Sequence, residues 1–282
     1  MIKVLKNIED ILEFNNNYKN SIGFVPTMGN LHAGHISLVE RSFQDNDTTV
    51  VSIFVNPKQF GESKDFKEYP KTFQDDSQKI KQLHNKYKDR HIYILSPIDE
   101  SIIYPKDFSD YISVNSLNSI SEGKTRPGHF DGVATVVNRL FKLVKPTKAY
   151  FGKKDYQQYL LVTKMVDNLK LNIEIIGMPI VREQDGLAMS SRNSRLDTVQ
   201  RQDSLLLSKT LLATLFELQT KGLVSAQNKI KETLRSDQRF NYLEIRNTCD
   251  FEIARETEED FVILGNFQLG DTRLLDNIEV TR

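Results

Sequence analysis

In the first 180 residues, short apolar runs rich in β-branched residues alternate with stretches that repeat apolar residues every three or four positions. Runs of the first kind predict strands, and stretches of the second kind predict helices. The expected strands are residues 22–27, 48–56, 91–97, 148–152 and 172–181. The expected helices between them are residues 35–44, 70–84, 132–144 and 157–169. Because several strands are nearly continuous apolar runs, helices should cover both faces, which predicts a doubly wound, Rossmann-like α/β domain with a parallel sheet.

The pattern changes after about residue 180. Two helical stretches lie at residues 204–219 and 224–236. Three strand-like segments follow, at residues 241–247, 260–270 and 272–280. Helices followed by strands are typical of a separate α+β domain. We therefore expect one domain at residues 1–180 and a smaller carboxyl-terminal α+β domain at residues 181–282, with the acidic run 256–260 as a solvated turn.

Composition excludes several classes of protein. Lys plus Arg and Asp plus Glu both number 38, so the net charge is zero, which argues against a dedicated nucleic-acid binder. Cys249 is the only cysteine, so no intrachain disulfide can form, and we expect it to be a half-buried small hydrophobe in a strand. The sequence has neither a signal-peptide pattern nor an apolar run of membrane-spanning length. We expect a cytoplasmic protein without membrane contact.

The stretch PTMGNLHAGH at residues 26–35 lies where the first of these strands ends and a helix begins. At that junction, the unpaired backbone N–H groups and the helix dipole favour an anion. His32 and His35 lie three residues apart and add imidazole donors on one face of the first turn. Gly34, between them, lets a phosphate or a flat ring approach the backbone. Each histidine alone is compatible with an ordinary capping or surface residue, but the HxGH pattern after a strand predicts a phosphate site.

Two further stretches follow predicted strands and carry polar side chains. VNPKQFG provides the amides of Asn56 and Gln59, groups that recognise hydroxyls and carboxylates. FGKKDYQQ provides a cation at Lys154 and a carboxylate at Asp155, followed by two amides. Taken singly, either stretch is compatible with a solvated loop.

The stretch AMSSRN at residues 188–193 concentrates two hydroxyls and a guanidinium in an expected loop. These groups suit phosphate oxygens. Together with the histidine pair and the loop that carries Lys154, they form the set of donors needed to bind a triphosphate and to stabilise charge during attack at phosphorus.

Two patterns give weaker signals. The GKT at residues 123–125 resembles the end of a P-loop, but that motif requires a glycine at position 118, which is Asn118 here. Asp75 and Asp76 offer hard oxygen ligands for magnesium, although acids near the first turn of a helix are often only complements of its dipole. No GxGxxG follows any strand, so a dinucleotide site of the usual type is not expected.

These motifs, in this order, closely resemble the pantothenate synthetase (pantoate–β-alanine ligase) family, which belongs to the HxGH nucleotidyltransferase superfamily. The resemblance rests on PTMGNLHAGH, VNPKQFG, RPGHFDGV, FGKKDYQQ and MSSRN, which span residues 26–193. It implies a two-step ligase. The pantoate carboxylate attacks the α-phosphorus of ATP to give pantoyl adenylate and pyrophosphate, and the amine of β-alanine then attacks the acyl carbon, releasing pantothenate and AMP.

The resemblance also implies roles for individual residues. The implied catalytic residues are His35, His32 and Lys154. Implied ATP-binding residues are Met28, Gly29, Asn30, Leu31, His32, Ala33, Gly34, His35, Gly152, Lys153, Lys154, Asp155, Val181, Met189, Ser190, Ser191 and Arg192. Pantoate is expected at Gln59, Gln158, Thr27 and Met28. β-Alanine is expected at Gln59, Asn56, Arg126 and His129. Asp75 is the expected ligand of magnesium. The expected cofactor is Mg²⁺, and the expected co-substrate is ATP.

The resemblance further implies a homodimer whose carboxyl-terminal domain closes over the active site. Three other interpretations stay open. One is another HxGH nucleotidyltransferase, which would adenylate a small phosphorylated acceptor such as a nucleotide monophosphate. A second is an RNA-binding protein descended from a synthetase, against which the neutral charge counts. The third is an inactive nucleotide sensor, although every motif position retains a competent residue.

Overall fold

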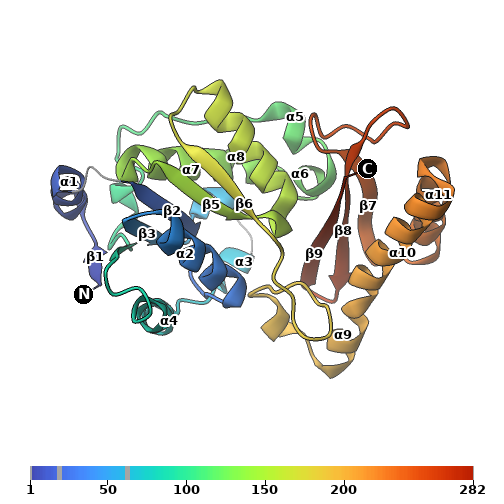
Figure 1. Ribbon diagram of the computed structural model, residues 1–282, viewed down its shortest axis with the longest axis horizontal. Coiled ribbons are helices and arrows are strands. Elements are labelled where there is room, and N and C mark those ends of the chain that lie inside the picture. Colours follow the sequence, from blue (N-terminus) through green and yellow to red (C-terminus); the bar gives the residue numbers. More distant parts are fainter. Residues whose placement is uncertain (1, 18–20, 61–63, 282) are drawn as a thin grey trace. The chain divides into compact units, whose positions relative to one another are not determined.

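The computed structural model describes residues 2–17, 21–60 and 64–281, and the chain divides into two compact units, Met1–Pro179 and Ile180–Arg282. In the first unit the strands are β1 (Lys3–Leu5), β2 (Ile22–Thr27), β3 (Thr48–Ile53), β4 (His91–Leu95), β5 (Lys148–Gly152) and β6 (Glu174–Met178). Its α-helices are α1 (Ile8–Asn17), α2 (Ala33–Asp45), α3 (Lys64–Lys67), α4 (Phe73–His84), α5 (Asn115–Asn118), α6 (Ser121–Thr125), α7 (His129–Val144) and α8 (Tyr156–Asn168). Short 3₁₀ turns are η1 (Pro57–Gln59), η2 (Glu100–Ile102) and η3 (Lys153–Asp155). Figure 1 colours the chain from the amino to the carboxyl terminus and labels most of these helices and strands.

The strands of the first unit form one parallel sheet in the order β1-β4-β3-β2-β5-β6. The chain runs outward from β2 through β3 to β4, and then crosses back to place β5 on the other side of β2. This confirms the predicted doubly wound α/β class. The point at which the winding reverses, between β2 and β5, is where ligands bind in such sheets, at the carboxyl ends of the strands.

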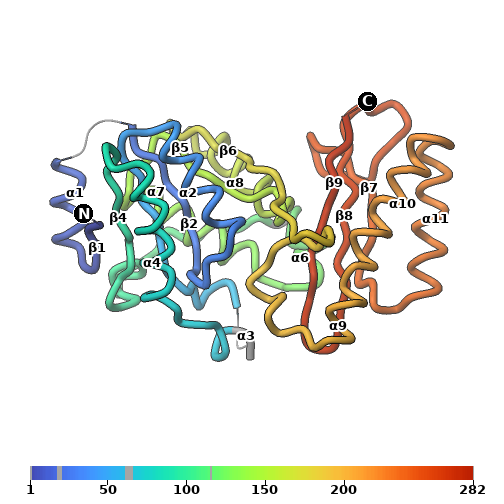
Figure 2. The backbone as a smooth tube through the Cα atoms, turned by 60° about the horizontal axis from the view of Figure 1, so that its bottom comes forward, coloured from blue at the N-terminus to red at the C-terminus, as the bar shows by residue number. Residues whose placement is uncertain are grey.

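Helices cover both faces of this sheet, as the apolar strands predict. Helices α2 and α4 bury one face in a cluster that includes Val25, Phe43 and Ile80. On the opposite face, Phe24 packs against α7, where the Phe24 and Phe141 rings meet edge to face with centroids 6.2 Å apart. Figure 2 follows the backbone of these layers. The core therefore holds β2 firmly, and the loop after it begins from a rigid strand end.

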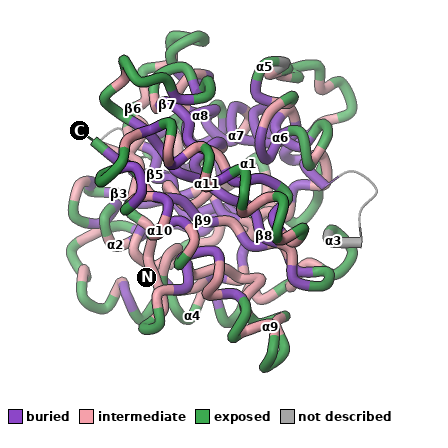
Figure 3. The backbone as a smooth tube through the Cα atoms, turned by 90° about the vertical axis from the view of Figure 1, so that its right-hand side faces the viewer, coloured by how far each residue is buried: buried purple, intermediate pink, exposed green. Residues whose placement is uncertain are grey.

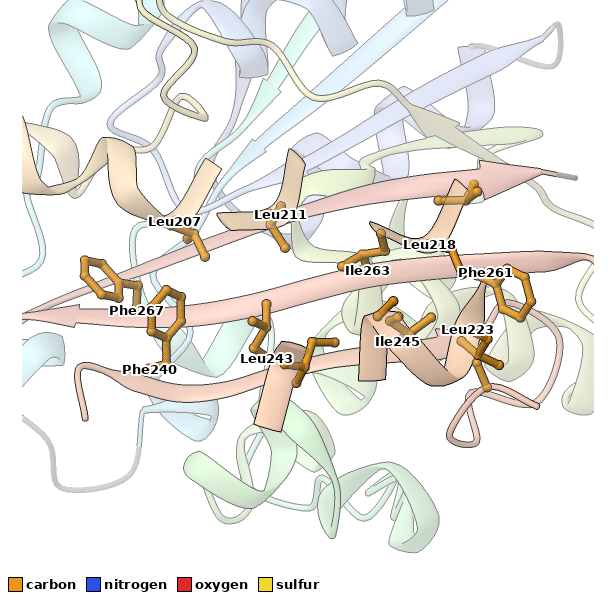
Figure 4. Close-up of a cluster of buried hydrophobic side chains, with 14 of the residues drawn as sticks. Leu207, Leu211, Leu218, Leu223, Phe240, Leu243, Ile245, Phe261, Ile263 and Phe267 are labelled. Carbon is orange, nitrogen blue, oxygen red and sulfur yellow. The ribbon is translucent and has the colours of Figure 1, made fainter. Parts of the chain in front are cut away.

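The second unit has helices followed by strands. Its elements are η4 (Asn193–Arg195), α9 (Thr198–Asp203), α10 (Leu205–Lys221), α11 (Leu223–Ser236), β7 (Phe240–Asn247), β8 (Asp260–Leu269) and β9 (Thr272–Thr281). The three strands form an antiparallel sheet in the order β7-β8-β9. Leucines of α10 and aromatic residues of the strands share one core, drawn in Figure 4. Strand β8, in the middle, is buried along nearly its whole length (Figure 3).

Most expected elements agree with the structure within a few residues, and the differences have local causes. The strand expected at residues 48–56 ends at Ile53, because Asn56 caps the turn η1 through a hydrogen bond from the Lys58 N–H. The amino-terminal stretch, which has helical spacing, begins with the short strand β1 before α1.

The expectation for Cys249 is wrong, because this residue is exposed and lies in a turn after β7. The Asn247 side chain accepts the N–H groups of Cys249 and Asp250 at 2.7 and 3.0 Å, which ends the strand. Within the described residues, no helix has the length and apolar character needed to cross a membrane.

Candidate active site

The loop that leads from β2 to α2 turns sharply through two residues with left-handed backbone. Gly29 has φ of 84° and Asn30 has φ of 51°. The turn aims the backbone N–H groups of Asn30 and Leu31 at the carboxylate of Asp76, at 2.9 and 2.7 Å. Gly29 cannot easily be replaced, because a Cβ there would lie 3.1 Å from Asp76 Oδ2 in addition to the strained φ.

Helix α4 and its N-cap hold this loop with three side chains spaced along one face. Thr72 accepts the Asn30 N–H at 3.0 Å and donates its hydroxyl hydrogen to Asp76 at 2.9 Å. One turn further on, Lys79 Nζ donates to the carbonyl of Leu31 at 2.7 Å. Asp76 is fully buried. Because its carboxylate is occupied by these donors, Asp76 fixes the backbone of the loop just before the histidine pair.

The histidine pair caps α2. His32 is the N-cap residue, and its Nδ1 accepts the Gly34 N–H at 3.1 Å, while His35 Nδ1 accepts the His32 N–H at 3.3 Å. The two rings lie 4.1 Å apart between centroids. A ring nitrogen that accepts a backbone N–H carries no proton, so the proton of each neutral imidazole lies on Nε2. Each ring is therefore oriented as an Nε2–H donor beside the positive end of the helix.

His35 is neutral at ordinary pH. Burial and the neighbouring His32 lower the pKa of His35 to about 3, Lys154 and Lys79 act in the same direction, and Asp155 opposes them. These groups come from three elements, which shows that the end of β5 and helix α4 approach the histidine pair. A neutral donor at this place can bind a phosphate oxygen without having to lose or gain a proton.

The loop after β5 carries the other predicted ATP residues. Gly152 is open on its Cβ side, with no other atom within 4 Å, so the backbone is accessible there. Lys154 Nζ lies 3.5 Å from Asp155 Oδ1, and both affect the pKa of His35. Lys153 instead lies over the Tyr159 ring, with Nζ 5.7 Å from its centroid. Lys154 and Asp155, both named from the sequence, thus act electrostatically on His35 in opposite directions.

Gln59 ends the turn η1 after β3 and is nearly buried. Its Nε2 donates to the Met28 sulfur at 3.1 Å, which places the amide beside the loop after β2. Its Oε1 accepts from Asn56 Nδ2 at 3.1 Å. Gln59 and Met28, both predicted to bind pantoate, are therefore in direct contact.

Arg126 and His129 contact the backbone of the same turn. His129 Nδ1 donates to the carbonyl of Gln59 at 2.9 Å, and Arg126 NH1 lies 2.9 Å from His129 Nε2. A carbonyl only accepts, so Nδ1 bears the proton and Nε2 accepts from the guanidinium. Arg126 also lies 3.9 Å from Glu122. Two of the predicted β-alanine residues thus contact the backbone carbonyl of Gln59.

The other predicted pantoate residues differ in how far their side chains are engaged. The Thr27 hydroxyl donates to the Ser52 carbonyl at 2.6 Å and accepts the Gly29 N–H, so it shapes the turn. Gln157 is buried and holds the backbone of residues 117–122 through three hydrogen bonds. Its neighbour Gln158 is partly exposed. Of the two adjacent amides, Gln158 is the one available to a substrate.

In the second unit, residues 181–193 form a hairpin that carries the predicted phosphate loop. Met189 N–H donates to the Val181 carbonyl at 2.9 Å, and Arg192 N–H donates to Ser190 Oγ at 3.2 Å. The hairpin is fastened within its own unit, because Arg182 forms a bidentate pair with Asp276 at 2.7 and 2.8 Å. Ser191 and Arg192 are half-buried in the turn that follows.

Arg201 of α9 adds a second fastening for the hairpin. It pairs with Glu183 at 2.7 Å and with Asp185 at 2.6 Å, and Glu183 also accepts from Asn193 at 2.7 Å.

The acids of α4 have different environments. Asp75 is exposed in the first turn, whereas the buried Asp76 accepts the loop donors described above. Nowhere in residues 2–17, 21–60 and 64–281 do three or more His, Cys, Asp or Glu side chains gather in a group able to hold a metal ion. Magnesium is commonly bound by one carboxylate together with phosphate oxygens and water. Asp75 therefore fits a magnesium ion only when a nucleotide is bound as well.

Sequence reasoning did not find Thr72, Asp76 and Lys79 as supports of the loop, nor Tyr104. The i, i+4, i+7 spacing of the first three was visible, but nothing in the sequence showed which loop they face. Tyr104 donates to Asn56 Oδ1 at 2.7 Å from 48 positions away in the chain. No local pattern indicates such a contact.

The fold and the site together define a class of protein: an α/β enzyme of the nucleotide-binding type, with a helix capped by two histidines at the reversal of the sheet, where such folds bind anions. The Pantoate-beta-alanine ligase family model matches residues 1–279. The chain belongs to the pantoate–β-alanine ligase family, as the sequence motifs predicted.

Relatives and solved structures agree with this assignment. The chain is 43% identical over 284 residues to the pantothenate synthetase of Caldicellulosiruptor bescii, covering 98% of each protein. It is similar to the solved pantoate–β-alanine ligase of Thermus thermophilus, with a TM-score of 0.90, 37% identity and full coverage of both chains. The ligase structure from Francisella tularensis, described as complexed with beta-gamma ATP and beta-alanine, has a TM-score of 0.74 and 32% identity, covering 99% of this chain and 97% of that one.

Proposed function

We propose that this enzyme condenses pantoate with β-alanine to form pantothenate, with pantoyl adenylate as the intermediate and AMP and pyrophosphate as by-products. The observation that carries the proposal is the histidine pair at the N-terminus of α2, in which each Nδ1 accepts a backbone N–H and each Nε2–H is left as the donor, with Lys154 near enough to lower the pKa of His35. Family membership and the Francisella complex with beta-gamma ATP and beta-alanine support the choice of substrates.

In the first step, a pantoate carboxylate oxygen forms a bond to the α-phosphorus, and the bond from that phosphorus to the bridging oxygen of pyrophosphate breaks. His32 and His35 donate hydrogen bonds to phosphate oxygens, and the Lys154 ammonium offsets the charge that develops on the α-phosphate. Gln59 and Gln158 hold pantoate so that its carboxylate is in line with the leaving group. No protein nucleophile takes part.

In the second step, the neutral amine of β-alanine attacks the acyl carbon, the bond from carbon to the AMP oxygen breaks, AMP leaves with the electron pair of that bond, and the nitrogen loses a proton to water. Arg126 and His129, next to Gln59, form the site for β-alanine in this proposal. Gly152 and Asp155 approach the ribose, and Val181 provides a backbone contact to adenine.

The predicted phosphate loop belongs to the second unit. Met189, Ser190, Ser191 and Arg192 would bind phosphate oxygens when the unit closes over ATP, as the resemblance implies, excluding water from an adenylate that hydrolyses readily. Asp75 would hold Mg²⁺, which when bound neutralises phosphate charge.

The proposal is tested with purified protein, ATP, magnesium and pantoate, with and without β-alanine, while pyrophosphate, AMP and pantothenate are measured. We expect pyrophosphate release that requires pantoate, with AMP and pantothenate appearing only when β-alanine is added. Folded, ATP-binding protein that releases no pantoate-dependent pyrophosphate would overturn the choice of acid. Nucleotide monophosphates would then be tested as acceptors.

We also propose that the enzyme is a cytoplasmic homodimer, as the family resemblance implies. Size-exclusion chromatography with light scattering tests the assembly. The expected mass is twice the 32.5 kDa of the chain, and a mass of 32.5 kDa at micromolar concentration would contradict it.

A further inference from the structure

Asn56 uses all of its hydrogen-bonding capacity inside the protein. Its Oδ1 accepts from the Tyr104 hydroxyl at 2.7 Å and from the Lys58 N–H at 3.3 Å. Its Nδ2 donates to Gln59 Oε1 and to the Gly132 carbonyl, both at 3.1 Å. An asparagine amide has two acceptor positions and two hydrogens, so this buried side chain is saturated. It has no hydrogen-bonding position left for a substrate.

The orientation of the Asn56 amide follows from its backbone partners. The Gly132 carbonyl can only accept, so Nδ2 must face it, and the Lys58 N–H can only donate, so Oδ1 must face that group. Asn56 Nδ2 therefore directs a hydrogen at Gln59, and Gln59 must accept it with Oε1. This leaves the Gln59 Nε2 hydrogens directed to Met28 and the loop after β2.

Tyr104 completes this arrangement as a fixed donor. Its ring is buried between Phe54 and Phe108, at centroid distances of 6.3 and 5.0 Å, and the Lys58 ammonium lies 4.7 Å from its centre. Burial raises the pKa of Tyr104 above its usual value, so its hydroxyl keeps its proton. The hydroxyl faces Asn56 Oδ1 and must donate to it.

We propose that Tyr104 is a positioning residue for the acid substrate, because its hydroxyl, together with the Lys58 N–H and the Gly132 carbonyl, holds Asn56 so that Gln59 turns its amide N–H₂ toward the substrate. This inference rests on the proposed function and adds a specificity to it. Gln59 acts as a hydrogen-bond donor, so the enzyme selects an acid that offers an oxygen acceptor at that point, a hydroxyl or a carboxylate oxygen. Asn56 acts through Gln59 and not by touching β-alanine.

The test compares Tyr104→Phe with Tyr111→Phe. Both variants lose only a hydroxyl near Lys58, but Tyr111 is exposed, and its ring lies 5.1 Å from the same ammonium. For Tyr104→Phe we expect kcat/KM for pantoate to fall about 5- to 30-fold, as the loss of one buried hydrogen bond predicts. KM for ATP should change less than about twofold, since the histidine site stays intact. Tyr111→Phe should match the wild type in kcat/KM for pantoate and in KM for ATP.

A mutant cycle with Gln59→Ala separates positioning from general support of the fold. If Tyr104 acts through Gln59, Tyr104→Phe should cause no further loss of kcat/KM for pantoate in the Gln59→Ala background. Asn56→Asp, which places a carboxylate against Gln59 Oε1 and the Gly132 carbonyl, should lower kcat/KM for pantoate more than Tyr104→Phe does. Melting temperatures measured in parallel confirm that each variant is folded.

The outcomes distinguish this inference from the proposed function. A wild-type enzyme without pantoate-dependent pyrophosphate release overturns both. Active wild type with unchanged Tyr104→Phe kinetics, or with equal losses in both Gln59 backgrounds, overturns only the role of Tyr104. If Tyr104→Phe does not fold, the inference is tested with Asn56→Asp instead. Unchanged kcat/KM for pantoate in Asn56→Asp would then overturn the inference.

Discussion

At the scale of single residues, the two histidines take the places that a serine and a glutamate usually take in a capping box. A glutamate carboxylate would satisfy the same backbone N–H as His35 but would turn a negative charge toward an incoming phosphate, and a serine hydroxyl at His32 would place its single donor much closer to the backbone than Nε2. Imidazole accepts with Nδ1 and donates with Nε2, so it caps the helix and binds an anion at the same time. The requirement for both abilities explains why two histidines appear together.

Replacing His35 by alanine should abolish most adenylation while the fold is kept. We expect pantoate-dependent pyrophosphate release to fall roughly 100- to 1000-fold, because the donor acts on charge that develops in the transition state. The control is His91→Ala, at the exposed start of β4, which should keep wild-type turnover. Near-normal rates in a folded His35→Ala protein would contradict the assignment.

The pH dependence of stability should reveal the neutral state of His35. The unfolded chain binds a proton at His35 below about pH 6.5, whereas the folded chain does so only near pH 3. Because the unfolded state then holds more protons, the free energy of unfolding should decrease as the pH falls from 6.5 toward 3. Urea unfolding of His35→Gln should show a shallower decrease over this range than the wild type and a parallel curve above pH 7. Parallel curves throughout would show that His35 is protonated alike in both states.

At the scale of elements, helix α4 fixes the loop of β2, and the buried Asp76 is its central contact. Asp76→Asn keeps the shape but places an amide against backbone N–H groups. It should therefore lower the free energy of unfolding by about 1–3 kcal/mol. Asp75→Asn, at the exposed neighbour, should change stability by less than about 0.5 kcal/mol. Equal stabilities of the two variants in urea titrations would contradict this role of Asp76.

Helix α7 approaches the turn η1 so closely that only glycine fits at position 132. A Cβ there would lie 2.3 Å from the Lys58 carbonyl oxygen and 2.7 Å from the Gln59 Cα. Gly132→Ala must therefore displace the turn, with an expected cost of about 1–3 kcal/mol in stability and a raised KM for pantoate. In thermal unfolding, Gly152→Ala provides the comparison, because its Cβ would meet no atom within 4 Å. Equal melting temperatures would show that the turn has room to move.

At the scale of the whole molecule, the sequence predicted the fold well because apolar periodicity reports which elements exist and which faces are buried. Its predictions for the candidate site rest on residues in the segments that follow strands, such as His35 after β2 and Lys154 after β5. It did not predict supports that depend on packing between distant elements, such as Asp76 on the loop of β2 or Tyr104 on Asn56. Cys249 was misplaced because its strand stops at the turn formed by Asn247, a contact that apolar pattern does not encode.

The second unit should depend on the pair formed by Arg182 and Asp276. Arg182→Met leaves the buried Asp276 carboxylate without its partner, and since Arg182 is one-third exposed we expect a loss of about 1–3 kcal/mol. Hydrogen exchange should speed up in residues 182–193 and in β9, while the parallel sheet keeps its protection. Unchanged exchange in the hairpin would mean that Arg201 alone fastens it.

The fastening of the hairpin has a consequence for recombination between family members. Asp276 and Arg201, which hold the hairpin, both belong to Ile180–Arg282, so an exchange of coding sequence at the boundary after Pro179 transfers the loop together with its supports. A crossover after Arg195 would instead pair a hairpin from one parent with supports from the other. Chimeras joined at the first point should therefore keep the hairpin together with the side chains that hold it, whereas chimeras joined at the second should lose that match.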